Sequence, residues 1–233
     1  MRSSRSFSGP TKERPFYKLE EIEEICDAEL IKLNLMPENP EPIRIDWFVE
    51  KRFKTTPQYE RLPDGILGFT KFGANGVENI VVDSKLDEEG TVVSERRVRT
   101  TLAHEAGHGL LHAYLFVVGV KTKKLFDDSH DDTLRVLCRD IKGVESNTKY
   151  NGQWWEYQAN RAMAALLLPR ILVGKAIVPY LVSRGVFGIM ALDQNKKDEA
   201  ISALSDIFNV NPVVVKFRLE EMYPLTDSQQ GCL

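Results

Sequence analysis

The stretch Thr101–Leu111, which reads TLAHEAGHGLL, is the most informative part of this 233-residue chain. Within it, His104, Glu105 and His108 form the pattern H-E-x-x-H. Residues four apart lie on the same face of an α-helix, one turn from each other, so both imidazoles can bind one metal ion. Glu105 is rotated by about 100° from His104 and lies beside such an ion, where it can accept a proton from a water molecule. The pattern therefore predicts a zinc site with its own base.

The flanking sequence favours a helix around this pattern. We expect the helix over 94–115, with Ser94 as the N-cap and an acidic residue, Glu95, in the first turn. Gly107 and Gly109 each cost about 1 kcal/mol relative to Ala in a helix, but small residues allow another backbone to approach closely. The apolar positions keep helical spacing, namely Val98, Leu102, Ala106, Leu110 and Leu111. The alternative is a buried helix with two structural histidines and a surface Glu105.

A third ligand is needed, because a catalytic zinc ion usually has three protein ligands and one open position. A third histidine of the H-E-x-x-H-x-x-G-x-x-H type is absent, since position 114 is Tyr114. The better candidate is Glu156, at the start of a helix expected over 154–168 and ended by Pro169. One turn later, the Asn160 oxygen can accept a hydrogen bond from a ligand histidine. Glu156 is equally compatible with a solvated acid that favours the helix N-terminus.

The two motifs together resemble the ImmA/IrrE family of metallo-endopeptidases. The first motif is Thr101–His112, and the second runs from Glu156 to Pro169 as EYQANRAMAALLLP. That family joins an H-E-x-x-H helix to a second helix of the form E-x-x-A-(N/D)-x-(F/A)-A-x-x-L-L-x-P. The resemblance extends more loosely over 16–222. The chain departs from the family in the long span between the two motifs, which indicates an extra excursion over 119–150.

The resemblance implies a site and an activity. It makes His104, His108 and Glu156 the zinc ligands, Glu105 the general base, and Asn160 a residue that holds a ligand histidine in place. It also implies a protein substrate, typically a DNA-binding transcriptional repressor cleaved to release stress, mobile-element or toxin–antitoxin genes. For this chain we expect a separately encoded helix-turn-helix regulator as the partner. The alternative function is a non-catalytic zinc-binding protein-interaction or toxin–antitoxin component.

The expected fold is α+β and zincin-like, with a small antiparallel sheet packed on the H-E-x-x-H helix and a mainly helical C-terminal half. An amphipathic helix is expected over 16–35, and a hairpin over 66–72 and 79–83. We expect the strand over 66–72 to be an edge strand that pairs with an extended substrate. Further helices are expected over 171–184, 196–208 and 212–222.

The domain organisation follows from these elements. We expect disordered tails over 1–15 and 226–233, a metallopeptidase domain over 16–170, and a helical subdomain over 171–225. The 119–150 excursion is expected to be an insertion or a lid. The segment 203–219 has a helix-turn-helix cadence, but acidic residues outnumber basic ones over 185–233. This charge balance favours a packing or dimerising unit over direct nucleic-acid binding.

Composition limits the remaining possibilities. The chain has 31 basic and 34 acidic residues, a net charge of −3, and 42% hydrophobic residues. Three widely separated cysteines (Cys26, Cys138 and Cys232) indicate reduced thiols in a cytoplasmic protein. No apolar run long enough to cross a membrane and no secretory signal is expected. His112 is expected to have a structural role or to support a ligand histidine rather than to bind the metal ion itself. The oxyanion stabiliser is left open among Tyr114, His130, Tyr150, Tyr157 and Arg161.

Overall fold

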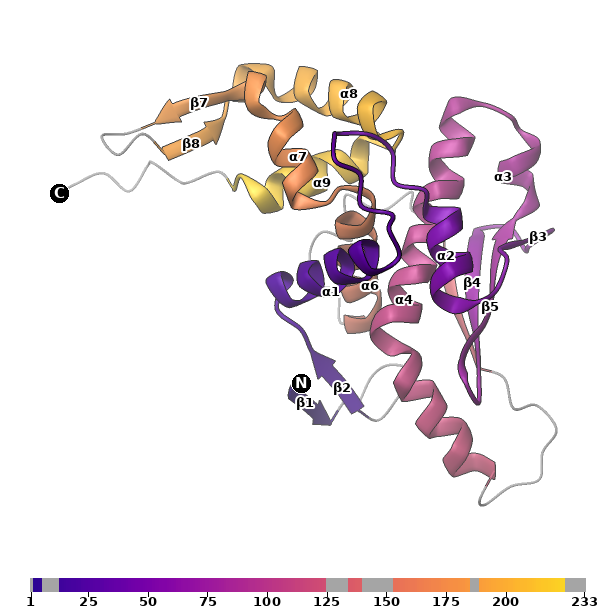
Figure 1. Cartoon of the computed structure of the whole chain (residues 1–233). Helices are drawn as coiled ribbons and strands as arrows, with labels where there is room; N and C mark the ends of the chain where they lie inside the picture. Colours follow the sequence, from indigo (N-terminus) through magenta and orange to yellow (C-terminus); the bar gives the residue numbers. More distant parts are fainter. Residues whose placement is uncertain (1, 6–12, 125–133, 140–152, 185–188, 225–233) are drawn as a thin grey trace.

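The computed structural model has the mixed α and β architecture expected from the sequence, with a small sheet at one side of a group of helices (Figure 1). One long helix passes through the centre, with the sheet on one side and shorter helices on the other. None of the helices in the described part of the chain is both long and apolar enough to cross a membrane. The structure describes residues 2–5, 13–124, 134–139, 153–184 and 189–224.

The central helix is α4 (Val92–Lys124), which is longer than expected at both ends. Thr91 caps it in place of Ser94, because each of these two residues donates its backbone N–H to the hydroxyl of the other at 3.0 Å. The short helix α3 (Ser84–Glu88) precedes it and begins at the Asp83 side chain, which accepts the N–H of Lys85. The H-E-x-x-H residues therefore lie well inside a continuous helix.

The sheet contains four strands in the order β3, β5, β4, β6. The expected hairpin is present as β4 (Ile66–Gly73) and β5 (Gly76–Asp83). The sheet is mixed and not antiparallel throughout as expected, because β3 (Gln58–Glu60) pairs with β5 in parallel. The prediction that 66–72 is an edge strand is wrong. β6 (Leu134–Arg139), which lies within the 119–150 excursion, pairs antiparallel with the edge of β4 that faces away from β5. That edge of β4 is therefore not open to a substrate strand.

The sheet packs closely on α4. Ile80 and Val82 of β5 belong to the same core as Leu102 and Ala106 of α4. A Cβ atom at Gly68 would lie 2.6 Å from Thr101 Cγ2, so only glycine allows β4 to approach the helix at this point. The sheet therefore lies directly against the turn of α4 that carries the H-E-x-x-H pattern.

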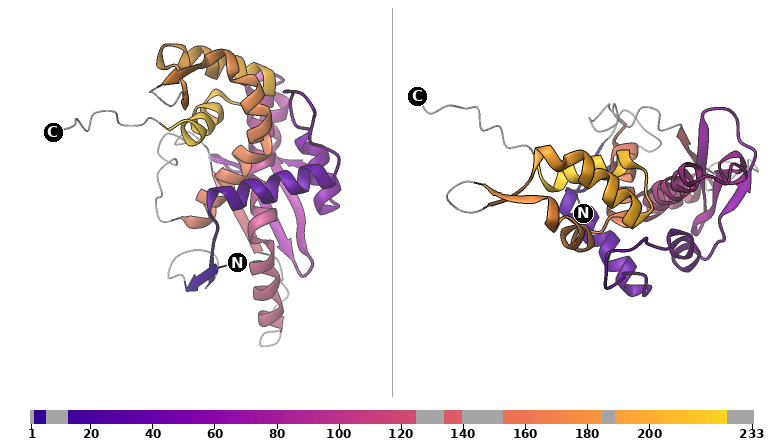
Figure 2. Two further views of the ribbon diagram at one scale, coloured as in Figure 1. Left: turned by 60° about the vertical axis from the view of Figure 1, so that its left-hand side comes forward. Right: turned by 90° about the horizontal axis from the view of Figure 1, so that it is seen from above.

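On the other side of α4 lies α6 (Trp154–Leu167), one residue shorter than expected, and α1 (Leu19–Lys32) packs against α6 (Figure 2). A Cβ at Gly107 would lie 2.9 Å from the Ala159 carbonyl oxygen and 3.0 Å from Ala162 Cβ. A Cβ at Gly109 would instead meet the Phe53 ring, in α2 (Ile45–Phe53). Only Gly107 thus admits α6, because residues two apart point to different sides of a helix.

At the N-terminus the structure differs from the expected tail over 1–15. β1 (Arg2–Arg5) and β2 (Glu13–Phe16) pair antiparallel. Pro15 is buried, and its carbonyl oxygen accepts a hydrogen bond from Gln158 Nε2 of α6 at 2.8 Å. This contact with a distant helix attaches the segment to the body of the protein.

The C-terminal half is less helical than expected. The helix predicted over 171–184 ends early as α7 (Arg170–Ala176), because Pro179 cannot continue a helix. A 3-10 turn (Val178–Tyr180) and the hairpin β7–β8 follow, and the hairpin projects from the body (Figures 1 and 2). The expected tail over 226–233 lies outside the described residues. The remaining bounds are Leu181–Arg184 for β7, Ile189–Leu192 for β8, Gln194–Lys196 for a second 3-10 turn, Lys197–Phe208 for α8 and Pro212–Met222 for α9.

Helices α8 and α9 have the expected bounds to within one residue. Asn209 ends α8 in the left-handed conformation, and Asn211 caps α9 by accepting the N–H of Val213 at 3.0 Å. Leu204, Phe208 and several α9 residues belong to the main core. The helix-turn-helix cadence therefore corresponds to two helices packed into the body of this chain.

Candidate metal centre

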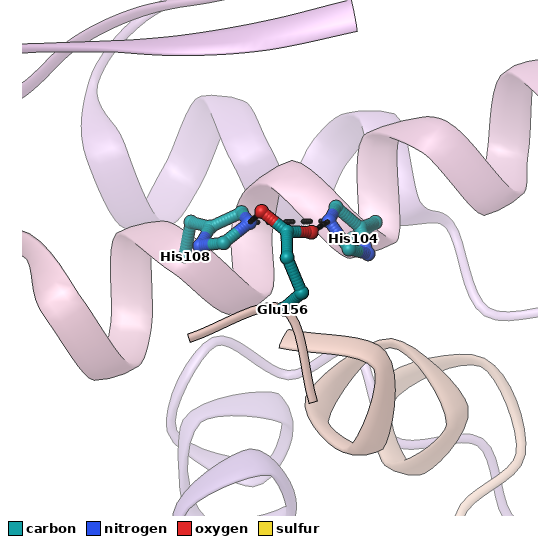
Figure 3. Close-up of side chains that lie close together, drawn as sticks. All are labelled: His104, His108 and Glu156. Atoms are coloured by element: carbon teal, nitrogen blue, oxygen red, sulfur yellow. Dashed lines mark hydrogen bonds and ion pairs between the residues drawn. The ribbon is translucent and has the colours of Figure 1, made fainter. Parts of the chain in front are cut away.

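The two histidines of the H-E-x-x-H pattern and Glu156 come together between α4 and α6. Figure 3 shows the Glu156 carboxylate between the His104 and His108 rings. The Nε2 atoms of the two histidines are 3.1 Å apart. Glu156 Oε2 lies 3.1 Å from His104 Nε2, and Glu156 Oε1 lies 3.6 Å from His108 Nε2. Three ligand atoms from two helices thus converge on one point.

The spacing of these atoms suits a metal ion. Ligand atoms at about 2.0–2.1 Å from a tetrahedral zinc ion lie roughly 3.3 Å from each other. The three observed distances fall around this value, and both histidines are almost fully buried. The group His104, His108 and Glu156 could therefore hold a metal ion.

Asn160 determines which nitrogen of His104 carries the hydrogen. Its Oδ1 atom, one turn along α6 from Glu156, lies 3.0 Å from His104 Nδ1. An amide oxygen only accepts hydrogen bonds, so His104 donates from Nδ1 and a neutral ring presents a lone pair at Nε2. This is the position expected for Asn160 from the sequence, beside the far nitrogen of a candidate ligand histidine.

The centre of the group is rich in hydrogen-bond acceptors. Burial alone would raise the pKa of Glu156, but positive charge on the His108 and His104 rings and hydrogen bonds from them lower this pKa well below its usual range, so the carboxylate is ionised when a cation shares the group. With neutral histidines, two lone pairs and a carboxylate face one another at 3.1–3.6 Å. Such an arrangement is repulsive unless a cation lies between the atoms. The chemistry of these residues therefore fits a bound metal ion.

Glu105 lies beside this group and is fully buried. The Thr70 hydroxyl of β4 donates to its Oε2 atom, while Oε1 has no hydrogen-bond partner among the described residues. Burial raises the pKa of Glu105, and the nearby His108 and His104 and the Thr70 hydrogen bond only partly offset this effect. A buried carboxylate oxygen without a partner is costly, so Oε1 is suited to a water molecule or a substrate group.

Thr70 was not singled out from the sequence. The signal that could have identified it is the alternation in β4, where Gly68, Thr70 and Phe72 share one face of the strand. Gly68 and Thr70 both meet α4 through Glu105, and Phe72 stacks on Phe116 of the same helix. A polar residue in the middle of a buried strand face is unusual and requires a partner.

His112 lies behind His108, away from the ligand group. Its Nδ1 atom is 3.0 Å from His108 Nδ1, and its Nε2 atom is 2.9 Å from Gln158 Oε1. Both ring nitrogens are thus engaged, and the Trp154 ring contacts the imidazole edge-on at 5.5 Å between centroids. Burial lowers the pKa of His112 to about 3, so the ring is neutral near pH 7. Like Thr70, Gln158 was not singled out from the sequence.

Several residues are candidates for oxyanion stabilisation in the sequence, and the structure describes only some of them. His130 and Tyr150 lie outside the described residues. Arg161 forms an ion pair with Glu221 of α9, and its guanidinium lies 4.4 Å from the centroid of the Tyr157 ring. These contacts hold Arg161 on the side of α6 that faces the C-terminal helices.

No protein-family model matches this sequence, and no curated protein matches it at a significant level. The chemistry of the centre between α4 and α6 is therefore the basis for assigning a function.

Proposed function

We propose that this protein is a zinc-dependent endopeptidase of the ImmA/IrrE type with a zincin-like fold. The observation that carries the proposal is the convergence of His104, His108 and Glu156 beside the buried Glu105, whose Oε1 atom has no partner among the described residues. A purely structural zinc site has no need of this carboxylate and usually has a closed shell of four protein ligands. The resemblance of the two sequence motifs to that family is the second support.

Zinc is the proposed ion because two imidazole nitrogens and one carboxylate oxygen are typical ligands of catalytic zinc. A bound zinc ion would lower the pKa of a water molecule and polarise a peptide carbonyl. His104, His108 and Glu156 would hold the ion through three positions. Asn160 supports this role because its oxygen keeps the hydrogen of His104 on the nitrogen that faces away from the group.

Glu105 is the proposed general base. Its Oε1 atom accepts a proton from the attacking water and then delivers the proton to the leaving amine. The Thr70 hydroxyl holds the other oxygen, Oε2, and so orients the carboxylate. A pKa raised by burial suits this role, because a group that both takes and gives a proton works best when its pKa is near the operating pH.

The proposed substrate is a protein, namely a separately encoded DNA-binding regulator such as a helix-turn-helix repressor. The resemblance suggests this class of substrate. The acidic surplus of the C-terminal region and the packing of α8 and α9 into the core argue against DNA itself as the ligand. The proposed setting is regulatory proteolysis in the cytoplasm.

The experiment compares the wild type with Glu105→Gln, each incubated with zinc and a helix-turn-helix regulator encoded beside this gene. Zinc content is measured by mass spectrometry of the metal, and cleavage is measured by mass spectrometry of the peptides. We expect the same zinc content in both proteins and cleavage only by the wild type. Glu50→Gln, at an exposed position on α2, is the matched control and should cleave normally.

Two outcomes would overturn the proposal. Equal action of the wild type and Glu105→Gln on the regulator would reject the peptidase and leave a non-catalytic zinc-binding interaction protein. In a parallel measurement, Glu156→Ala should lower the zinc content. Full occupancy of that variant would reject Glu156 as a ligand.

A further inference from the structure

A chain of hydrogen bonds leads from the backbone of β2 to the metal centre. It begins at the Pro15 carbonyl oxygen, which lies 2.8 Å from Gln158 Nε2. A carbonyl oxygen only accepts hydrogen bonds, so the Gln158 amide must present its NH₂ group to Pro15. Gln158 therefore presents its oxygen, Oε1, to the next group in the chain.

The next group is His112, whose Nε2 atom lies 2.9 Å from Gln158 Oε1. Because an amide oxygen cannot donate, the hydrogen of this bond must be carried by His112 Nε2. The neutral His112 ring then has a lone pair and no hydrogen at Nδ1. The backbone of β2 thus selects one tautomer of His112 through Gln158.

The last step reaches the ligand histidine. His108 Nδ1 lies 3.0 Å from His112 Nδ1, and one of these nitrogens must donate. His112 Nδ1 has only a lone pair, so His108 donates from Nδ1. The remaining nitrogen of His108, Nε2, then directs its lone pair toward His104 Nε2 and Glu156.

The opposite tautomers of His112 and His108 would prevent His108 from binding a metal ion. A hydrogen on His112 Nδ1 would place the His112 Nε2 lone pair against the Gln158 oxygen, and His108 would carry its hydrogen on Nε2. That N–H would point into the ligand group and block the nitrogen. His108, His112 and Gln158 are at most 5% exposed, so the surrounding solvent cannot readily replace the lost hydrogen bonds.

We propose that His112 and Gln158 are positioning residues that hold His108 in the tautomer able to bind a metal ion, with the Pro15 carbonyl as the anchor. His104 and His108 are thereby oriented by separate hydrogen bonds. Asn160 orients His104, and the hydrogen-bonded series from Pro15 through Gln158 and His112 orients His108. The inference rests on the proposed metal centre and is independent of the substrate.

The direct test uses the wild-type protein without metal. Long-range ¹H–¹⁵N correlation spectra of the histidine rings at neutral pH identify which nitrogen carries the hydrogen. We expect His108 to carry a hydrogen on Nδ1, with or without a further proton between its Nε2 atom and Glu156, and His112 to carry its hydrogen on Nε2. A hydrogen on Nδ1 of His112, or a charged His112 ring, would overturn the proposal without any substitution.

A pair of variants tests the consequence for metal binding. His112→Phe keeps a ring of similar size beside Trp154 but removes the acceptor for His108. We expect it to weaken zinc binding by about tenfold or more, measured by competition with a chelator, and to give His108 a mixture of tautomers. His112→Gln should restore most of the affinity, because its amide can accept from His108 and donate to Gln158.

Gln158 provides a second matched pair. Gln158→Leu removes the acceptor of His112 and should weaken zinc binding, whereas Gln194→Leu, at an exposed amide in the second 3-10 turn, is the control and should leave the affinity unchanged. Wild-type affinity in folded His112→Phe and Gln158→Leu would reject the proposal. None of these measurements depends on cleavage, so they separate this inference from the peptidase activity. Absence of zinc binding by the wild type would reject the proposed function, while the tautomers would still be measured.

Discussion

Among individual residues, the hydrogen bond that each side chain already makes decides which of its atoms is available to act at the candidate metal centre. Asn160 engages Nδ1 of His104, and His112 engages Nδ1 of His108. Thr70 engages one oxygen of Glu105 and leaves the other without a partner among the described residues. In each case one polar atom is held so that the other is available, which is how neighbouring groups support a metal site.

If the proposed function is correct, Thr70→Val should change the pH dependence of peptide cleavage. Glu105 must be unprotonated to accept a proton, so the acid limb of kcat/KM follows its pKa. Burial raises this pKa and Thr70 lowers it, so loss of the hydroxyl should raise it further and move the acid limb to higher pH. We expect kcat/KM on that limb to fall roughly tenfold, since a hydrogen bond to a charged group contributes about 1.5–3 kcal/mol.

The control for this prediction is Thr100→Val. The Thr100 hydroxyl is also buried, but it donates to the Arg96 carbonyl oxygen within α4. Its loss should leave the pH profile in place. An unshifted acid limb in Thr70→Val, with zinc content equal to that of the wild type, would show that Thr70 does not act on Glu105.

At the scale of the element, the close contact between α4 and α6 brings the ligands together. Glu156 comes from α6 and the histidines from α4, so the separation of the two helices sets the distance between ligand atoms. Gly107 permits this separation, since a side chain there would meet Ala159 and Ala162. Small residues on both helices are therefore needed for the ligand distances of the candidate metal centre as well as for packing of the core.

Gly107→Ala should separate these two helices. Alanine is favoured over glycine in a helix by about 1 kcal/mol, but overpacking costs about 1–3 kcal/mol. We expect lower stability in thermal unfolding and weaker zinc binding, because α6 moves with Glu156. Gly174→Ala is the matched control. A Cβ there meets nothing within 4 Å, so this substitution in α7 should be neutral or stabilising. Unchanged zinc binding in Gly107→Ala would contradict the argument.

The pairing of β4 also belongs to this scale. The strand that was expected to receive a substrate has β5 on one side and β6 on the other. The two edges of the described sheet are therefore β3 and β6. Local alternation of apolar residues predicted β4 as a strand, but it carried no information about which segment would pair with it.

At the scale of the whole molecule, a buried ion network joins the N-terminal and C-terminal halves. Glu23 of α1 accepts two hydrogen bonds from Arg170 at 2.8 and 2.9 Å and a third from Arg218 of α9. Arg218 is 1% exposed and also donates to the Leu168 carbonyl oxygen at 3.0 Å. The network fixes α9 against the start of α7 and against α1.

Arg218→Met should destabilise the protein strongly, because removal of one partner leaves Glu23 and Glu221 in a buried site with less compensation. Breaking a buried ion pair in this way typically costs about 3–5 kcal/mol, measured by denaturant unfolding. Lys197→Met, which removes the more exposed Lys197–Glu220 pair, is the control and should cost at most about 1 kcal/mol. Similar losses in both variants would show that the buried network has no special role.

The same network predicts a pH dependence of stability. Burial alone would raise the pKa of Glu23, but Arg170 and Arg218 lower it below its ordinary value. A carboxyl group with a lowered pKa in the folded state stabilises the protein above the unfolded pKa of about 4.3 and loses this contribution as pH falls. The difference in unfolding free energy between the wild type and Glu23→Gln should therefore be largest near pH 7 and shrink below about pH 4. A constant difference across this range would contradict the prediction.

Much of the architecture was predictable because it depends on local spacing. Period-3.6 patterns predicted α1, α6, α8 and α9 to within a few residues, and period-2 patterns with an Asn-Gly pair predicted the β4–β5 hairpin. The predicted helix over 171–184 is wrong beyond Ala176, because Pro179 has no backbone N–H to donate to a continuing helix. For the centre, spacing alone placed His104 and His108 on one face. For Glu156, the sequence alone is equally compatible with a metal ligand and with a solvated acid at a helix N-terminus.

The local elements and the types of side chain available at the centre follow from the sequence alone, because helix and strand periodicity act over a few neighbouring residues. Tertiary packing brings Glu156 to His104 across 52 residues, Thr70 to Glu105 across 35, and Gln158 to Pro15 across 143. Contacts at such separations depend on how whole elements pack, and many packings satisfy the same local pattern. The hydrogen positions on His108 and His112 follow from these contacts, so they too were decided by the fold.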